Sequence, residues 1–146
     1  MEQDRCLVEQ ALAAREQAYA PYSNFLVGAA ALFEDGRIFT GCNVENASYG
    51  GTVCAERVSI WAGVAQGEGG PGKKLQKIAI VGGKRGAEIL DFCLPCGFCL
   101  QVMAEFAICQ NQQDLQILLA KIEKGKLLQI QPYHLKELLP HSFILE

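Results

Sequence analysis

Two short stretches constrain this chain more than any others, Cys54-Ala55-Glu56 and Pro95-Cys96-Gly97-Phe98-Cys99. The two cysteines of the second stretch are three residues apart, so they face the same side of a helix's first turn. We expect Pro95 in that first turn, because the N–H that proline lacks has no helical partner there. If Cys54 opens an earlier helix, the fold has to bring three thiols and the Glu56 carboxylate together.

Three converging thiols are suited to a zinc ion. Three protein ligands leave the fourth tetrahedral position for water, as catalytic zinc sites do. Glu56 would then lie beside a metal-bound water, where a carboxylate can act as general acid and base. Cys-x-Glu followed by Pro-Cys-x-x-Cys is the signature of the zinc deaminases. The sequence therefore predicts one zinc ion per chain, held by Cys54, Cys96 and Cys99, with Glu56 as the catalytic residue.

Two other interpretations of these cysteines stay open at this point. A redox pair of the thioredoxin kind at Cys96 and Cys99 is one, although it leaves Cys54 and Glu56 without a role. A purely structural zinc site is the other, and it would need a fourth protein ligand. Cys93 and Cys42 are the candidates. For both, burial as a small apolar residue is the alternative.

Three thiolates on Zn²⁺ sum to a net charge of about −1, which opposes the activation of a bound water. The two helix N-termini that carry the ligands offset part of this charge. Arg57 is the side chain placed to hydrogen-bond a thiolate, and a solvated helix position is its alternative. The only histidines, His134 and His141, are far from both motifs in the sequence, so acid–base chemistry falls to Glu56.

Length and charge narrow the remaining possibilities. With 146 residues we expect one domain over residues 1–146, zinc-binding and catalytic. The net charge of −3 argues against a nucleic-acid partner, for which a basic surface is expected. Seven cysteines, an odd number, suit thiols and metal ligands rather than disulfides. The first residues lack the apolar core of a signal peptide, and the longest apolar run, Phe25 to Phe33, is too short to span a bilayer. We expect a cytoplasmic protein with no membrane partner.

The order of elements predicts the fold class. Helices are expected over Asp4–Tyr19, Ala55–Gln66, Pro95 to about Cys109, and His134–Leu139. Strands are expected over Leu26–Phe33, Ile38–Asn43, Ile78–Val81, Leu115–Ala120 and Leu127–Gln131. Strands interleaved with helices indicate an α/β protein, a three-layer α/β/α sandwich around one mixed sheet of about five strands. Each cysteine motif would lie where a strand's connection enters a helix, the end of an open sheet that binds ligands.

With these motifs assembled, the chain resembles the small homotetrameric cytidine deaminases. Besides the cysteine motifs, the resemblance rests on three segments: Phe25 to Ala30, Gly41 to Ala47, and Leu138-Leu139-Pro140-x-Ser142-Phe143. It implies hydrolytic deamination of cytidine and deoxycytidine to uridine and deoxyuridine, with release of ammonia, in pyrimidine salvage. In that mechanism zinc-bound hydroxide attacks C4, while Glu56 protonates N3 and then carries a proton to the departing amine.

The resemblance also implies which residues bind the nucleoside. Asn43 and Glu45 would hold the sugar hydroxyls, and residues i and i+2 of an extended chain do point the same way. Phe25 would pack along the base, and the backbone of Ala55 would help to recognise the amino group. Tyr49 and Phe143 would reach a neighbouring subunit's site, which makes the homotetramer part of the catalytic unit. Without the resemblance, each of these residues could be an ordinary polar or core position.

The chain departs from the family at two positions that flank the second motif. Leu100 stands where relatives usually carry arginine, and Leu94 replaces a small polar residue. A deaminase for the nucleoside antibiotic blasticidin S, and an inactive or structural zinc-binding relative, are the alternatives to a cytidine deaminase. Glu56 argues against the structural protein, because a zinc site kept for stability needs no carboxylate there. A polynucleotide editor is disfavoured, because basic and aromatic residues do not alternate along the chain.

Overall fold

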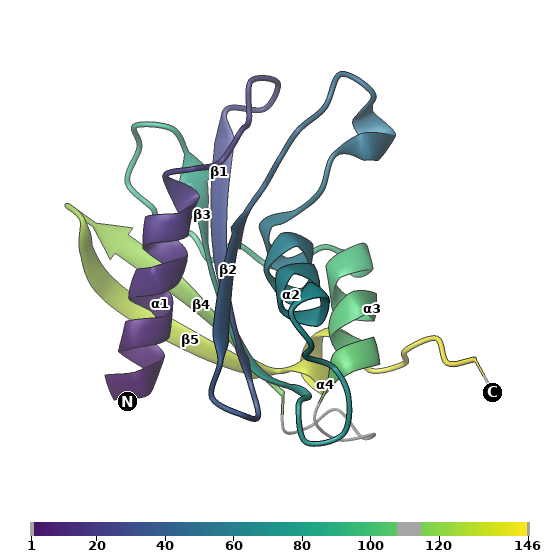
Figure 1. Ribbon diagram of the computed structural model, residues 1–146. Helices are drawn as coiled ribbons and strands as arrows, with labels where there is room; N and C mark the ends of the chain where they lie inside the picture. The colour runs from purple at the N-terminus through teal and green to yellow at the C-terminus, as the bar shows by residue number, and fades with distance from the viewer. Residues whose placement is uncertain (1, 108–114, 146) are drawn as a thin grey trace.

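A computed structural model describes residues 2–107 and 115–145. Its core is one five-stranded sheet in the order β2-β1-β3-β4-β5 (Figure 1). The strands are β1 (Phe25–Phe33), β2 (Ile38–Cys42), β3 (Leu75–Lys84), β4 (Gln116–Glu123) and β5 (Lys126–His134). The helices are α1 (Glu2–Arg15), α2 (Ala55–Ala65), α3 (Gly97–Phe106) and α4 (Leu135–Leu138), with a 3₁₀ turn η1 at Tyr49–Gly51. None of the described helices is long and apolar enough to cross a membrane.

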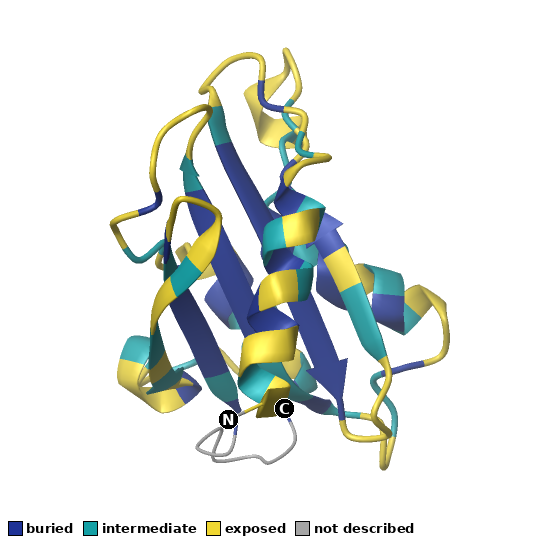
Figure 2. Cartoon of the chain, turned by 90° about the vertical axis from the view of Figure 1, so that its left-hand side faces the viewer, coloured by how far each residue is buried: buried dark blue, intermediate teal, exposed yellow. Residues whose placement is uncertain are grey.

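The helices cover the sheet on both faces, which confirms the predicted three-layer α/β/α sandwich. Figure 1 shows α1 on one face and α2 and α3 side by side on the other. Strand β1 is buried on both faces, since Ala29, Ala31 and Phe33 join the core under α2 and α3 whereas Ala30 and Leu32 join the core under α1. This is why its sequence is continuously apolar rather than alternating. Figure 2 shows the buried central strands behind the more exposed outer face of α1.

The pairing of the strands places both cysteine motifs at one end of the sheet. β1 pairs antiparallel with β2 and with β3, so β2 and β3 run in the same direction. Their carboxyl ends therefore lie at the same end of the sheet, and the connections to α2 and α3 leave from there. β3 and β4 are parallel and β4 and β5 antiparallel, which makes the sheet mixed as predicted.

Helix α1 lies unusually close to β1 because a glycine faces it. A Cβ on Gly28 would be 2.0 Å from the Ala11 carbonyl oxygen and 2.5 Å from the Arg15 amide nitrogen. Both are backbone atoms, so a side chain at residue 28 would push the helix off the sheet. The close approach brings the end of α1 against the strand ends that border the pocket described below.

Several element boundaries differ from the expected ones. Pro95 is not in the first turn of α3, because Cys96 is the N-cap and the helix begins at Gly97. β3 is ten residues long, extending well beyond the expected Ile78–Val81. Helix α1 ends at Arg15 rather than at Tyr19. The expected end of α3 near Cys109 lies outside the described residues.

Candidate active site

The three predicted metal ligands come together at the starts of two helices. Cys54 is the N-cap of α2 and Cys96 is the N-cap of α3, while Cys99 is in the first turn of α3. The sulfur of Cys96 is 3.7 Å from that of Cys54 and 3.6 Å from that of Cys99. All three sulfurs lie within 4.8 Å of one another, and no further Cys, His, Asp or Glu from the described part of the chain joins them.

These distances fit a zinc ion. Sulfurs bound tetrahedrally at about 2.3 Å from zinc are about 3.8 Å apart. Two of the sulfur–sulfur separations are within about 0.2 Å of this value. Three sulfurs occupy three corners of the tetrahedron and leave the fourth for a non-protein ligand, which is the arrangement of a catalytic zinc site. A redox pair would not require the third sulfur, so the geometry favours the metal over a disulfide.

Hydrogen bonds within the sulfur cluster shift the pKa values of its thiols. Arg57 donates from Nη2 to the Cys54 sulfur over 3.3 Å. The pKa of Cys54 is lowered to about 5, first by its hydrogen bond with Cys99, with a further contribution from Arg57 and opposed by burial. The same hydrogen bond is the largest cause that raises the pKa of Cys99. The cluster thus favours a thiolate at Cys54, the form that binds a metal.

Glu56 is a buried carboxyl beside this cluster. Only 3 % of the residue is exposed, in the first turn of α2. The pKa of Glu56 is raised to about 7, chiefly by burial and also by the charge of Cys54, while hydrogen bonds with its own backbone and with Cys99 oppose the rise. A carboxyl with a pKa near neutrality can both accept and release a proton, which is what general acid–base catalysis requires.

A pocket of about 320 Å³ opens onto the cluster and Glu56. It lies at the carboxyl ends of β2 and β3, as expected for an open α/β sheet. Its volume suits a small molecule and its lining is mostly apolar, with a few polar groups. The lining residues are Ser23, Phe25, Val27, Asn43, Glu45, Thr52, Val53, Cys54, Ala55, Glu56, Cys93, Leu94 and Cys96.

Four of the six sequence-predicted nucleoside contacts lie in this wall: Phe25, Asn43, Glu45 and Ala55. The Asn43 amide is fixed by β1, because its Oδ1 accepts from the Val27 N–H at 2.9 Å and its Nδ2 donates to the Phe25 carbonyl at 2.8 Å. Glu45 accepts hydrogen bonds from the Tyr22 and Ser23 amides and from the Ser23 hydroxyl. The Ser23 hydroxyl bond is the largest cause that lowers the pKa of Glu45.

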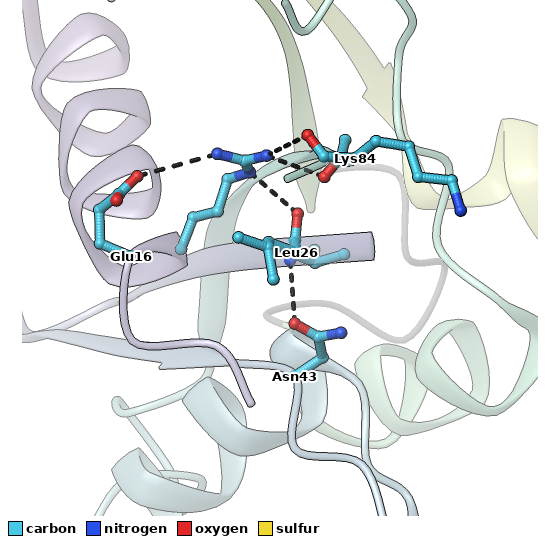
Figure 3. Close-up of polar contacts among 7 residues, drawn as sticks. Glu16, Leu26, Asn43 and Lys84 are labelled. Carbon is cyan, nitrogen blue, oxygen red and sulfur yellow. Dashed lines mark hydrogen bonds and ion pairs between the residues drawn. The ribbon is translucent and has the colours of Figure 1, made fainter. Parts of the chain in front are cut away.

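Arg15 holds the strand ends behind this wall. Its guanidinium donates from Nε to the Leu26 carbonyl at 3.0 Å, and from Nη2 to the carbonyls of Gly83 and Lys84 at 2.8 and 3.1 Å. Figure 3 shows these bonds on one side of β1 and the Asn43 amide on the other. Arg15 of α1 therefore fixes the ends of β1 and β3 by hydrogen bonds. The β1 backbone that orients Asn43 is part of the same strand end.

Tyr49 and Phe143 lie outside the pocket. Tyr49 is 75 % exposed and its ring packs edge-on against Tyr22, with centroids 5.9 Å apart, in the wall of an adjoining pocket. Phe143 is 68 % exposed, and its backbone is held by two hydrogen bonds with the Gln101 side chain. Neither side chain lines the pocket of its own chain.

The two family departures have different surroundings. Leu100 is buried in the core between the sheet and α3, so an apolar residue suits this position. Leu94 is 58 % exposed and lines the pocket mouth. Cys42 and Cys93 do not join the sulfur cluster. Burial raises the pKa of the Cys93 thiol to about 12, so Cys93 is a neutral wall residue.

Sequence reasoning missed five of the wall residues: Ser23, Val27, Thr52, Val53 and Cys93. Ser23 and Thr52 come from loops, and only their closeness in sequence to Phe25 and to Cys54 could have indicated them. Cys93 was considered as a metal ligand, whereas it belongs to the wall that faces Glu56. His134 is the N-cap of α4, and it does not belong to the sulfur cluster.

Comparison with known proteins assigns the family. Residues 1–111 match the family model described as the cytidine and deoxycytidylate deaminase zinc-binding region, which is more than half of the chain. The chain belongs to the cytidine and deoxycytidylate deaminase family. The zinc ion predicted from the sequence agrees with this family and with the sulfur cluster.

Relatives within the deaminase family are similar over most of the chain. A cytidine deaminase of Halalkalibacterium halodurans is 40 % identical over 140 residues, which is 96 % of this chain and 93 % of the relative. A crystal structure of a cytidine deaminase from Burkholderia pseudomallei has a TM-score of 0.74 and 42 % identity, covering 94 % of this chain and 97 % of that one. The cytidine deaminase structure from Mycobacterium tuberculosis has a TM-score of 0.71 and 41 % identity, with 96 % of each chain covered.

Proposed function

We propose that this protein deaminates cytidine and deoxycytidine hydrolytically to uridine and deoxyuridine, with release of ammonia. The observation that carries the proposal is the buried Glu56 carboxyl beside a three-sulfur cluster, at the end of a pocket sized for a small molecule. A zinc ion held by Cys54, Cys96 and Cys99 would supply Lewis acidity that makes water a nucleophile at neutral pH. The name given to the relatives supports cytidine as substrate.

Glu56 is proposed to move protons at two atoms of the substrate. It donates a proton to N3 of the cytosine ring, which makes C4 more electrophilic, and it takes a proton from the attacking water. It then delivers this proton to the departing 4-amino group, and the new C4 hydroxyl returns a proton to Glu56 as the carbonyl forms. Water supplies the oxygen that replaces the amine, so the reaction consumes one water and releases one ammonia. The raised pKa of Glu56, about 7, supports both steps, because the acid and base forms are then both accessible near neutrality.

The pocket wall is proposed to orient the nucleoside. Phe25 would pack along the base, and the backbone of Ala55 would contact the amino group. Asn43 and Glu45 would bind the sugar hydroxyls. Asn43 retains one Nδ2 hydrogen beyond the bond to Phe25, and Glu45 has lone pairs beyond those used by residues 22 and 23. Arg57 would offset the negative charge of the ligands through its bond to Cys54.

We further propose that the whole chain is one catalytic domain that works as a homotetramer. The exposure of the Tyr49 and Phe143 side chains supports a role in a neighbouring subunit's site. A place in pyrimidine salvage follows from the nucleoside substrate. Location in the cytoplasm is supported by free thiols at Cys6, Cys42, Cys54, Cys93, Cys96 and Cys99, which suit a reducing compartment.

The decisive test follows the ultraviolet absorbance of cytidine with purified protein, with zinc per chain determined on the same sample. We expect loss of the cytidine signal and about one zinc per chain. Glu56→Gln should keep zinc and fold while kcat falls by at least about 10³-fold, since general acid–base catalysis at two atoms is lost. Glu105→Gln, an exposed glutamate of α3, is the matched control and should behave as the parent.

The outcomes separate the alternatives. Zinc without turnover of cytidine, but with turnover of blasticidin S, would make the protein the related antibiotic deaminase. Zinc with no turnover of either compound would make it an inactive relative. If Glu56→Gln deaminates at the parent rate, the acid–base role given to this residue is wrong.

A further inference from the structure

The Arg57 guanidinium lies close to two aromatic rings. Its central carbon is 5.9 Å from the ring centroid of Trp61 and 5.4 Å from that of Phe98. Trp61 is one turn after Arg57 on α2, at i+4, where helical side chains meet. Phe98 belongs to α3, between the ligands Cys96 and Cys99 in the sequence. The rings therefore approach the cation from two helices that lie side by side (Figure 1).

The two rings lie near a guanidinium whose hydrogen bonds are incomplete. Its Nε atom is buried and has no hydrogen-bond acceptor among the described residues. A buried N–H without a partner is costly. The face of an aromatic ring carries negative charge density and attracts a cation within about 6 Å of its centroid. Both centroids are within this distance, so the rings can stabilise the guanidinium charge in place of an oxygen acceptor.

Neither ring is needed to fill the core. Phe98 is 74 % exposed and Trp61 is 45 % exposed. Meanwhile the other end of the guanidinium, Nη2, is 3.3 Å from the Cys54 sulfur. A long arginine side chain at a partly buried position would otherwise sample several rotamers, and fixing it costs conformational entropy. Contact with two rings favours the rotamer in which the guanidinium reaches the sulfur.

We propose that Trp61 and Phe98 are positioning residues that form an aromatic clamp on Arg57 and hold its guanidinium against the metal-ligating sulfur of Cys54. The proposal rests on the proposed function, since it assumes that Cys54 binds zinc. It adds that the countercharge at the metal site depends on two rings that do not belong to the sulfur cluster and do not line the pocket. Because Phe98 is in the first turn of α3 and is not itself a ligand, loss of its ring should loosen Arg57 without removing a ligand.

The test compares Phe98→Leu, which keeps an apolar side chain but removes the ring, with Phe98→Tyr, which keeps a ring. Zinc release to a chelator is timed, and the sulfur-to-metal charge-transfer band is recorded on cobalt(II)-substituted protein. Phe98→Leu should release zinc about threefold faster, the loss expected for one exposed cation–π contact, and should shift the band. Phe98→Tyr and Trp61→Phe should match the parent. Leu128→Ala, at an exposed β5 position, controls for the loss of exposed apolar surface.

A second background separates the clamp from the function of Arg57. In Arg57→Gln protein the ring has no cation to hold, so adding Phe98→Leu should change neither zinc release nor the cobalt band. If Phe98→Leu has its full effect in that background, or has no effect on either readout in the parent, the clamp is wrong while the proposed role of Arg57 stands. If Arg57→Gln itself moves neither readout, the proposed role of Arg57 fails, and the clamp fails with it.

Discussion

Asn43 shows how one side chain can be both structural and functional. Its amide joins the end of β2 to β1 through two hydrogen bonds, and the residue is only 9 % exposed. Val27 requires an acceptor and Phe25 requires a donor, so the amide has one possible orientation. The remaining Nδ2 hydrogen then has a fixed direction before any substrate arrives. A sugar-binding group that is preorganised in this way loses little entropy on binding.

We therefore predict that Asn43→Ala affects stability and substrate binding together. The change leaves the buried Val27 N–H and the partly buried Phe25 carbonyl without this partner, which should lower the free energy of unfolding by about 2 kcal/mol. It should also raise KM for cytidine by a larger factor than it lowers kcat, because the sugar is distant from the reacting C4 atom. Urea denaturation and steady-state kinetics measure the two effects. Gln129→Ala, at an exposed position of β5, should change stability by less than about 0.5 kcal/mol. An Asn43→Ala protein as stable as this control would contradict the structural role.

At the scale of elements, the β1–β2 turn is joined to the loop after α2 by charged side chains. Arg37 forms an ion pair with Glu68 at 3.1 Å, donates to the Gln66 carbonyl and stacks on Phe39. The Glu68 side chain is fully buried. Its burial, and after it the neighbouring Asp35 carboxyl, raise the pKa of Glu68, while Arg37 opposes the rise. The ionised form of Glu68 is therefore disfavoured in the folded protein.

This arrangement predicts a pH dependence of stability. An acid whose folded-state pKa is raised binds more protons in the folded than in the unfolded state, so its contribution to stability decreases as pH rises. The decrease begins near the unfolded value of about 4.3 and ends above the folded one. Asp35→Asn removes one negative charge and keeps the Oδ1 that accepts from the Arg37 amide. It should raise the Tm by a few degrees at pH 8 and by nothing at pH 4. Thermal unfolding across this range is the measurement, and an equal shift at both pH values would contradict it.

The elements also show what the sequence could and could not predict. The continuous apolar run of β1 and the two cysteine motifs predicted the sheet, the layers and the sulfur cluster, because burial and ligand spacing leave few alternatives. The length of β3 was underestimated, since its ends carry Lys77 and Lys84, which look like loop residues. Lys77 is instead paired with Asp4 of α1, and Lys84 donates to the Ser23 carbonyl. Such partners are distant in the sequence, so a local pattern cannot reveal them.

The pocket wall could likewise be predicted only in part from the sequence. Residues carried by a motif could be named in advance, whereas Ser23 and Thr52 enter the wall through loops whose path depends on the whole fold. The start of α3 was misplaced by two residues for a local reason. Pro95 is compatible with a first turn, but it is equally compatible with the extended position before an N-cap, and Cys96 takes the N-cap.

At the scale of the whole molecule, the proposed tetramer can be tested through the site itself. Phe143 is exposed and lies outside its own chain's pocket, although Gln101 fixes its backbone. If Phe143 completes a neighbouring site, then Phe143→Ala and Glu56→Gln damage different parts of one composite site. A hybrid assembly contains sites in which a Phe143→Ala subunit keeps its own Glu56 and receives Phe143 from a Glu56→Gln neighbour.

We predict that such hybrids recover activity. The two variants are co-expressed with different tags and purified through both, and deamination of cytidine is compared with that of each variant alone. Hybrids should exceed the average of the two parents several-fold, because only the mixed assembly contains undamaged sites. A Glu56→Gln hybrid with Glu56→Ala is the matched control and should stay inactive, since both subunits lack the same group. Hybrids no more active than the average would mean that Phe143 acts within its own chain, and the exposed C-terminal segment would then have to close over its own pocket for catalysis.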